Sequence, residues 1–172
     1  MTHPTDGKTL ILVRHAKSSW KDASLADIDR PLNKRGRRNA PVMGRWLHEQ
    51  GPGPDAVISS PANRALSTAQ TIARELSFES EQIVIDEDLY FVGTDGMLRA
   101  LERVDDRLGR VMMVGHNPVM TRLLNQLTGS DVWNMPTCAI AIIHFAMESW
   151  GLVDSTRGSL VAYQEPKSLE TF

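Results

Sequence analysis

The chain has 172 residues, of which 41% are hydrophobic, and this suits one compact domain with a sizeable core. The formal net charge of −2 does not favour a general nucleic-acid-binding face, and the single cysteine, Cys138, excludes an internal disulfide. No apolar run approaches membrane-spanning length and no targeting segment is recognisable, so we expect a cytoplasmic protein without membrane or nucleic-acid partners. We predict one domain over residues 8–172, preceded by a disordered lead-in at residues 1–7.

Apolar strand-like runs alternate with helical patterns from the start of the chain. Residues 8–13 predict a buried strand, and a polar loop follows at residues 17–29, to which the sequence assigns no role. Asn33 is typical of a helix N-cap, and the apolar spacing continues that helix to about residue 50, where Gly and Pro residues end it. The basic run Lys34-Arg35-Gly36-Arg37-Arg38 is typical of a solvated helix face.

The alternation continues through the rest of the chain. Residues 56–58 predict a second strand, after which we expect a helix with Pro61 in its first turn and Ser60 as its N-cap. Further elements are predicted as strands at 83–85 and 111–114, helices at 94–104 and 118–127, and antiparallel edge strands at 139–145 and 159–163. This order predicts an α/β fold with a mostly parallel sheet and helices on both of its faces.

Two histidines directly follow apolar runs. The first run leads into Arg14-His15-Ala16, and the run at residues 111–114 leads into Gly115-His116-Asn117-Pro118. Ligands of open α/β sheets bind at the carboxyl ends of the strands, so we expect both imidazoles at one edge of the sheet. The strand at residues 56–58 is followed by a segment that would bring Arg64 to the same edge.

These side chains are the types that a phosphoryl group requires. Arg14 and Arg64 can each direct two donors at phosphate oxygens, and a protonated His116 would add positive charge. His15 could attack phosphorus and form a covalent phosphohistidine, provided that a backbone carbonyl or a carboxylate holds its other ring N–H. The sequence contains no zinc-ligand spacing and no Gly-rich nucleotide loop, so we predict neither a metal nor a cofactor.

Together these motifs resemble the histidine phosphatase superfamily. Leu12-Val13-Arg14-His15-Ala16 resembles its Arg-His-Gly signature, with Ala16 in place of Gly, while residues 59–69 and 114–118 resemble its second and third signatures. Residues 14–20 and 29–32 resemble the short, SixA-like phosphohistidine phosphatase branch. The resemblance implies a phosphoglycerate mutase-like three-layer α/β/α sandwich without a cofactor. It also implies a nucleophile and a phosphate pocket, namely His15 with Arg14, Arg64 and His116.

The sequence departs from many superfamily members at the general acid. In those members an acidic residue follows the apolar position that corresponds to Leu89, where this chain has Tyr90 and Phe91. Glu87, just before that position, and Asp22, in the loop after His15, are the remaining candidate acids. SixA-like members generally lack the acid, which suits a phosphoramidate substrate, because an imidazole leaving group needs less proton donation than an alkoxide.

The combined prediction is a metal-independent phosphatase that acts through His15, most simply on phosphohistidine in a protein. One alternative is a phosphatase or mutase for small phosphorylated metabolites, and another is a phosphate-recognition module without turnover. The physiological substrate and the oligomeric state do not follow from the sequence. Trp20 either lines the pocket mouth or packs on the core, His144 is typical of a core or strand-edge histidine, and Cys138 is typical of a buried thiol.

Overall fold

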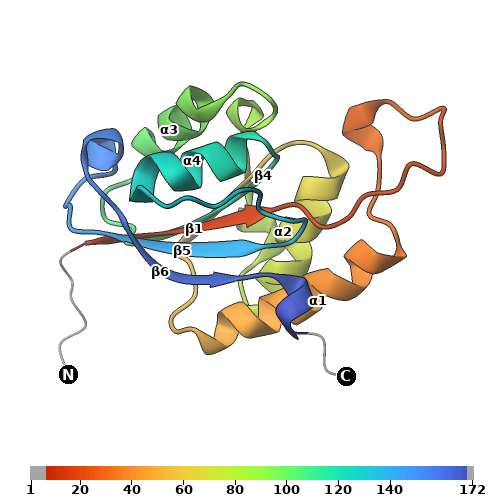
Figure 1. Cartoon of the computed structure of the whole chain (residues 1–172), viewed down its shortest axis with the longest axis horizontal. Coiled ribbons are helices and arrows are strands. Elements are labelled where there is room, and N and C mark those ends of the chain that lie inside the picture. The colour runs from red at the N-terminus through yellow and green to blue at the C-terminus, as the bar shows by residue number, and fades with distance from the viewer. Residues whose placement is uncertain (1–6, 170–172) are drawn as a thin grey trace.

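The computed structural model describes residues 7–169, so most of the lead-in predicted at residues 1–7 lies outside the described residues. Its centre is a six-stranded sheet in the order β3-β2-β4-β1-β5-β6 (Figure 1). The strands are β1 (Lys8–Arg14), β2 (Ala56–Ser59), β3 (Val84–Ile85), β4 (Arg110–Gly115), β5 (Ile140–Phe145) and β6 (Ser159–Gln164). The first four run parallel to one another, whereas β5 and β6 are antiparallel to their neighbours.

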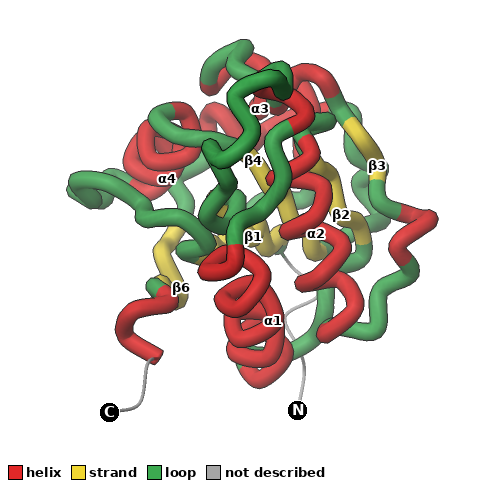
Figure 2. The backbone as a smooth tube through the Cα atoms, turned by 90° about the vertical axis from the view of Figure 1, so that its right-hand side faces the viewer, coloured by secondary structure: helices red, strands yellow, loops and turns green. Residues whose placement is uncertain are grey.

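Helices cover both faces of this sheet (Figures 1 and 2). Helices α1 (Lys34–Glu49) and α2 (Asn63–Glu75) pack on one face, while α3 (Thr94–Glu102) and α4 (Val119–Thr128) pack on the other. Successive side chains of a strand point to opposite faces, so Leu10 and Leu12 enter the core beneath α3 and α4, while Ile11 and Val13 enter the core beneath α1 and α2. The expected three-layer α/β/α sandwich is confirmed.

The start of α1 follows its sequence signals. The Asn33 side chain accepts a hydrogen bond from the Gly36 amide at 2.8 Å, which confirms Asn33 as the N-cap. The four basic side chains of the run that follows are exposed, as expected of a solvated face. On the inner side of the helix, Met43 and Leu47 are buried against the sheet.

Two local predictions are wrong. Helix α2 begins at Asn63 behind Ala62, so both Ser60 and Pro61 precede the helix and its N-cap has no side-chain hydrogen bond. The Ser60 hydroxyl instead is hydrogen-bonded to His116 and accepts from the Ala62 amide at 3.2 Å. The late strands are not both edge strands, since β5 lies between β1 and β6 and only β6 is at the edge. The continuous buried run from Ile140 to Ile143 explains the inner position, because a strand covered on both faces needs apolar residues throughout.

Candidate active site

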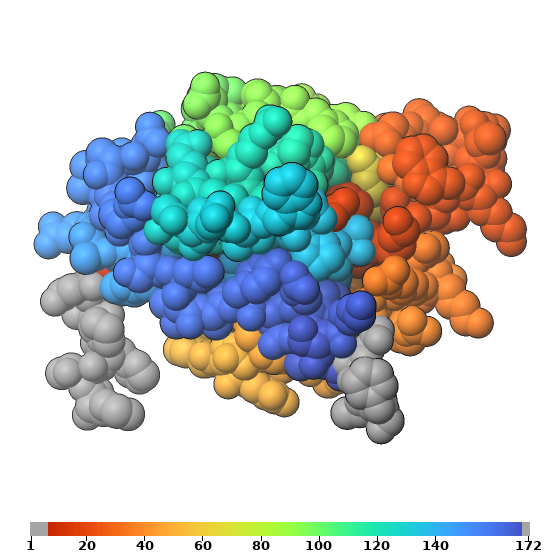
Figure 3. All heavy atoms as spheres, in the orientation of Figure 1, coloured from red at the N-terminus to blue at the C-terminus, as the bar shows by residue number. Residues whose placement is uncertain are grey.

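The strand register brings the predicted site together at one edge of the sheet. Arg14, the last residue of β1, lies opposite Gly115, the last residue of β4, and Ser59 of β2 lies opposite Val114. The residues just beyond these strand ends are therefore neighbours, and the ring centroids of His15 and His116 are 5.1 Å apart. The loop that follows β1, red-orange in Figure 3, forms this end of the molecule.

A pocket of about 300 Å³ opens at this edge. Its lining residues come from the ends of β1 and β4, the loop after β1, the start of α2 and two further loops: Arg14, His15, Lys17, Ser18, Trp20, Asp27, Arg30, Arg64, Phe91, His116, Asn117 and Thr137. All four side chains predicted for the phosphate pocket are among them. The two candidate acids, Asp22 and Glu87, do not line it; both are exposed, and Asp22 accepts hydrogen bonds from Ser24.

His15 is held in a defined tautomer. Its Nδ1–H donates to the carbonyl of Ala16 at 2.7 Å, so the lone pair of its other ring nitrogen, Nε2, is free. The backbone carbonyl that the sequence required is thereby identified. Thr68 fixes this turn, because its hydroxyl accepts from the Ala16 amide at 2.9 Å and donates to the Arg64 carbonyl at 2.7 Å.

The surroundings of His15 keep the ring neutral. Burial lowers its pKa to about 4; the hydrogen bond to Ala16 opposes that shift, and the positive charges of Arg64 and Arg14 add to it. At neutral pH the imidazole therefore has a free lone pair, which is the state that a nucleophile requires.

His116 is fixed by one hydrogen bond and by two aromatic rings. Its Nε2 is 2.7 Å from the Ser60 hydroxyl, the Phe91 ring stacks on it at 4.8 Å, and Tyr90 meets it edge-on at 5.5 Å. Burial, with the nearby His15, lowers its pKa to about 3. In the free protein, desolvation and the surrounding positive charge therefore disfavour the protonated His116 that the sequence analysis considers for a bound phosphoryl group.

Arg64 is oriented by a carboxylate that the sequence analysis missed. Its guanidinium is almost fully buried and donates to the carbonyl of Asp27 at 2.7 Å and to its carboxylate at 3.0 Å. Tyr90 donates to the same carboxylate at 2.6 Å, and Arg30 forms an ion pair with it at 3.2 Å. The hydrogen bond from Tyr90, followed by those from Arg64 and Arg30, lowers the pKa of Asp27 to about 2, so this carboxylate stays ionised.

Unpaired donors are concentrated at this pocket. Within residues 7–169, four buried side-chain nitrogens have no hydrogen-bond partner, and three of them are Arg14 Nε, Arg64 Nε and His116 Nδ1. Arg14 is anchored through Nη1, which donates to the Met135 carbonyl at 2.8 Å. Because buried polar groups are normally paired, this concentration indicates a site arranged for an anion.

The loop after β1 adds a further guanidinium to the pocket wall. Arg30 donates to the Ser18 hydroxyl at 2.8 Å, and the Trp20 ring lies 3.5 Å from its Cζ atom. Trp20 is 73% exposed and lines the pocket, so it lies at the mouth rather than in the core. Arg30 belongs to the segment 29–32 that carried the family resemblance, but no local pattern of residues indicates its contact with the pocket.

The remaining candidates have structural roles. Cys138 is buried, and burial raises the pKa of its thiol to about 12, which confirms an unreactive side chain. His144 is half-buried in β5, far from the catalytic pocket, at a second pocket described below. Among residues 7–169 no helix has the length and apolarity to cross a bilayer, and no group of three or more His, Cys, Asp or Glu side chains has the arrangement of a metal site.

Comparisons with known proteins agree with this geometry. Residues 10–90 match the family model described as "Histidine phosphatase superfamily (branch 1)". An uncharacterized protein of Mycobacterium tuberculosis is 33% identical over 165 residues, covering 90% of this chain and 100% of that protein.

Solved structures share the whole fold. A crystal structure from Agrobacterium tumefaciens, assigned as a phosphohistidine phosphatase SixA, is 26% identical with a TM-score of 0.78, over 92% of this chain and 98% of that one. The protein histidine phosphatase SixA complexed with tungstate has a TM-score of 0.79 at 22% identity, over 94% of this chain and 99% of that one. At 22% identity, the similarity to the tungstate complex shows a shared fold and no more.

Proposed function

Because this chain belongs to the histidine phosphatase superfamily, we propose that it is a phosphohistidine phosphatase that works through a covalent phosphate on His15, without a metal ion. The observation that carries the proposal is the state of His15. Its Nδ1–H is held by the Ala16 carbonyl and its pKa is about 4, so Nε2 carries a lone pair in a pocket lined by guanidinium groups.

The reaction has two steps. In the first, His15 Nε2 attacks phosphorus, the P–N bond of the substrate breaks, and the substrate ring, which carries a proton on its other nitrogen, leaves as neutral imidazole. In the second, water attacks the phosphorus on His15, which releases inorganic phosphate and restores the neutral ring. Together the two steps hydrolyse phosphohistidine to histidine and inorganic phosphate.

The other pocket residues stabilise the transferring group. Arg14 and Arg64 direct donors at the phosphoryl oxygens, and their unpaired Nε atoms are available for that purpose. The Asp27 carboxylate accepts a hydrogen bond from Arg64 at 3.0 Å and so holds its guanidinium in place. A bound phosphoryl dianion opposes the positive charge of the pocket, so it raises the pKa of His116 and favours the protonated form that the free protein lacks.

Among the described residues that line the pocket none is a suitable acid, and this supports a phosphoramidate over a phosphoester. The carboxylate that lines the pocket, Asp27, has a pKa of about 2 and is therefore ionised, so it cannot donate a proton to a leaving group. The Tyr90 hydroxyl donates its hydrogen bond to Asp27, and the Phe91 side chain has no acidic proton. An alkoxide leaves poorly without a proton, whereas an imidazole is a much weaker base.

The pocket mouth supports a protein as the carrier of the phosphohistidine. Trp20 and Phe91 line the pocket and are 73% and 53% exposed, so aromatic surface surrounds the opening. Aromatic side chains are enriched at protein interfaces. One of the similar structures is itself described as a protein histidine phosphatase.

Comparing substrates side by side tests this choice. We expect kcat/KM to be highest for a phosphohistidine-bearing protein, lower for free phosphoramidate, and lowest for phosphoesters such as p-nitrophenyl phosphate and a sugar phosphate. Faster hydrolysis of the sugar phosphate than of the phosphohistidine protein would contradict the proposal and favour the small-metabolite alternative.

Trapping the intermediate separates an enzyme from a phosphate-recognition module. With radiolabelled substrate and a rapid quench, we expect label bound to the protein through an acid-labile, base-stable bond. The His15→Ala variant should trap none and should lose turnover, while its circular dichroism spectrum stays unchanged. Turnover by a well-folded His15→Ala variant would rule out this mechanism.

A further inference from the structure

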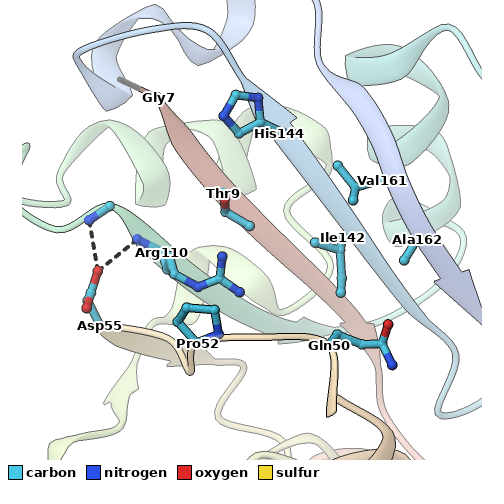
Figure 4. Close-up of a pocket in the computed structure, with 11 residues that line it drawn as sticks. Gly7, Thr9, Gln50, Pro52, Asp55, Arg110, Ile142, His144, Val161 and Ala162 are labelled. Carbon is cyan, nitrogen blue, oxygen red and sulfur yellow. Dashed lines mark hydrogen bonds between the residues drawn. The ribbon is translucent and has the colours of Figure 1, made fainter. Parts of the chain in front are cut away.

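A second, larger pocket of about 530 Å³ lies at the opposite end of β1 and β4 (Figure 4). It is on the face of the sheet that α1 and α2 cover elsewhere, just past the end of α1 at Glu49. Three sheet residues with polar side chains, Thr9, Arg110 and His144, line it together with residues from β6 and the loop after α1. Nothing in the proposed reaction uses these residues.

The strand register places the three polar side chains in one row. Thr9 of β1 lies opposite Arg110 of β4 on one side and opposite His144 of β5 on the other. The next row on the same face is apolar and consists of Ile11, Met112 and Ile142. The face therefore changes from an apolar row to a polar one where α1 ends, and this leaves the polar row open to the pocket.

Arg110 is a partly buried cation that forms no ion pair within residues 7–169, although the Asp55 carboxylate lines the same pocket and opposes the effect of burial on the pKa of Arg110. Its Nε is buried and unpaired within residues 7–169, and burial lowers its pKa. The nearby carboxylate of Asp55 accepts instead from the backbone amides of Gly109 and Arg110, both at 2.9 Å (Figure 4). A buried N–H without a hydrogen-bond partner is costly, so the unpaired Nε of Arg110 in the wall of a pocket indicates a ligand.

The neighbours of Arg110 complete a site with one polar and one apolar side. Thr9 and His144 line the pocket in the same row as Arg110, and a hydroxyl and an imidazole N–H are both groups that can donate to an anion held by Arg110. Figure 4 shows the guanidinium between Thr9 and Pro52, with Ile142 beside it. Ala162 and Val161 of β6 extend the apolar side.

We propose that this pocket binds a small organic anion. Its carboxylate or phosphate head would pair with Arg110 and accept hydrogen bonds from Thr9 and His144, while its apolar body would lie over Ile142 and Ala162. The site goes beyond the proposed function, because Arg14 lies five positions after Thr9 along β1, about 17 Å away at the rise of a strand.

Nuclear magnetic resonance with two probes tests the proposal on the whole chain. Benzoate represents carboxylates, phenylphosphonate represents phosphates that cannot be hydrolysed, and benzylamine is the cationic control. We expect saturable shifts at Arg110 Nε–H, the Thr9 amide and the His144 ring with one or both anions, and none with benzylamine. Binding of benzoate would identify the head group of the ligand as a carboxylate, and binding of phenylphosphonate would identify it as a phosphate.

Matched variants assign the binding to the guanidinium. Arg110→Gln should bind the anion about tenfold more weakly or not at all, whereas Arg122→Gln, which removes an exposed arginine of α4, should bind as the parent does. Both variants should keep the parent rate of phosphoramidate hydrolysis, so a failure here is distinct from a failure of the proposed function.

The proposal would be overturned by shifts that never saturate with either anion, or by equal affinity in the parent and Arg110→Gln. If Arg110→Gln does not fold, the same comparison is made with Thr9→Val, which removes a donor and keeps the side-chain shape. Unchanged affinity in that variant would likewise contradict the site as described.

Discussion

Asp27 connects the polar side chains that shape the catalytic pocket. Its carboxylate accepts from Arg64 and Tyr90 and forms an ion pair with Arg30. Arg64 can present its remaining donors to a phosphoryl group only while this contact holds the guanidinium plane. We therefore regard Asp27 as a positioning residue rather than an acid.

The variant Asp27→Asn tests this role. It keeps the shape of the side chain but weakens the ion pairs, so we expect kcat/KM for phosphoramidate to fall about tenfold, mainly through a higher KM. Tyr90→Phe, which removes one donor to Asp27 and no charge, should have a smaller effect in the same direction. Steady-state kinetics measures both, and parent-like values for Asp27→Asn would contradict the positioning role.

The pH dependence of catalysis reports the state of His15. The nucleophile must be neutral, and its pKa in the folded protein is about 4. We expect kcat/KM, which reports the free enzyme, to stay level as the pH falls through 6.5 and to decline only as it approaches 4. Rates corrected for uncatalysed hydrolysis would show this, and an acidic limb centred at the ordinary histidine pKa would contradict it.

At the level of elements, the first turn of α1 supports the catalytic loop. A Cβ atom on Gly36 would overlap the backbone carbonyl of Lys17, which shows how closely the helix approaches the segment after His15. The Lys17 carbonyl also accepts from the Asn33 amide at 2.9 Å. The N-cap and the glycine thus position a loop that lines the pocket.

The substitution Gly36→Ala should harm both stability and activity. Alanine stabilises a helix by about 1 kcal/mol relative to glycine. The overlap with a backbone atom would nevertheless force the helix away from the loop, so we expect the free energy of unfolding to fall by about 1–3 kcal/mol. Denaturant unfolding measures the loss, and Arg38→Ala, an exposed change in the same helix, should cost much less. A Gly36→Ala variant at least as stable as the parent would contradict this packing.

For the whole molecule, the two desolvated imidazoles make stability depend on pH. The pKa values of His15 and His116 in the folded protein are about 4 and about 3, below the ordinary value of 6.5. Between these values and 6.5, the unfolded chain binds protons that the folded protein does not. Stability is therefore highest above pH 6.5 and falls as the pH is lowered.

Urea unfolding at a series of pH values tests this linkage. From about pH 7 to about pH 5 we expect the free energy of unfolding to fall by about 3–4 kcal/mol, because each of the two rings contributes about 2 kcal/mol over this range. The variant His116→Gln, which removes one of the two groups, should show a shallower decline over the same range. Stability that is constant over this range would mean that the two rings are not desolvated as described.

The sequence by itself determined the layer order and the location of the chemistry. Apolar runs alternating with amphipathic patterns predict a parallel sheet between helices, and such sheets bind ligands at the carboxyl ends of their strands. Arg14, His15, Arg64 and His116 could be assigned to one edge because each follows a strand, and all four line one pocket. These signals are local, so they can be read without knowing any long-range contact.

Only the tertiary structure decided which distant groups touch. Asp27 reaches Arg64 because the loop after β1 folds back over α2, and Ser60 lies beside His116 instead of capping α2. The polar row beside Arg110 exists only once the register of β4, β1 and β5 is set. Loop paths and strand register depend on packing across the whole chain, and no local pattern of residues encodes them.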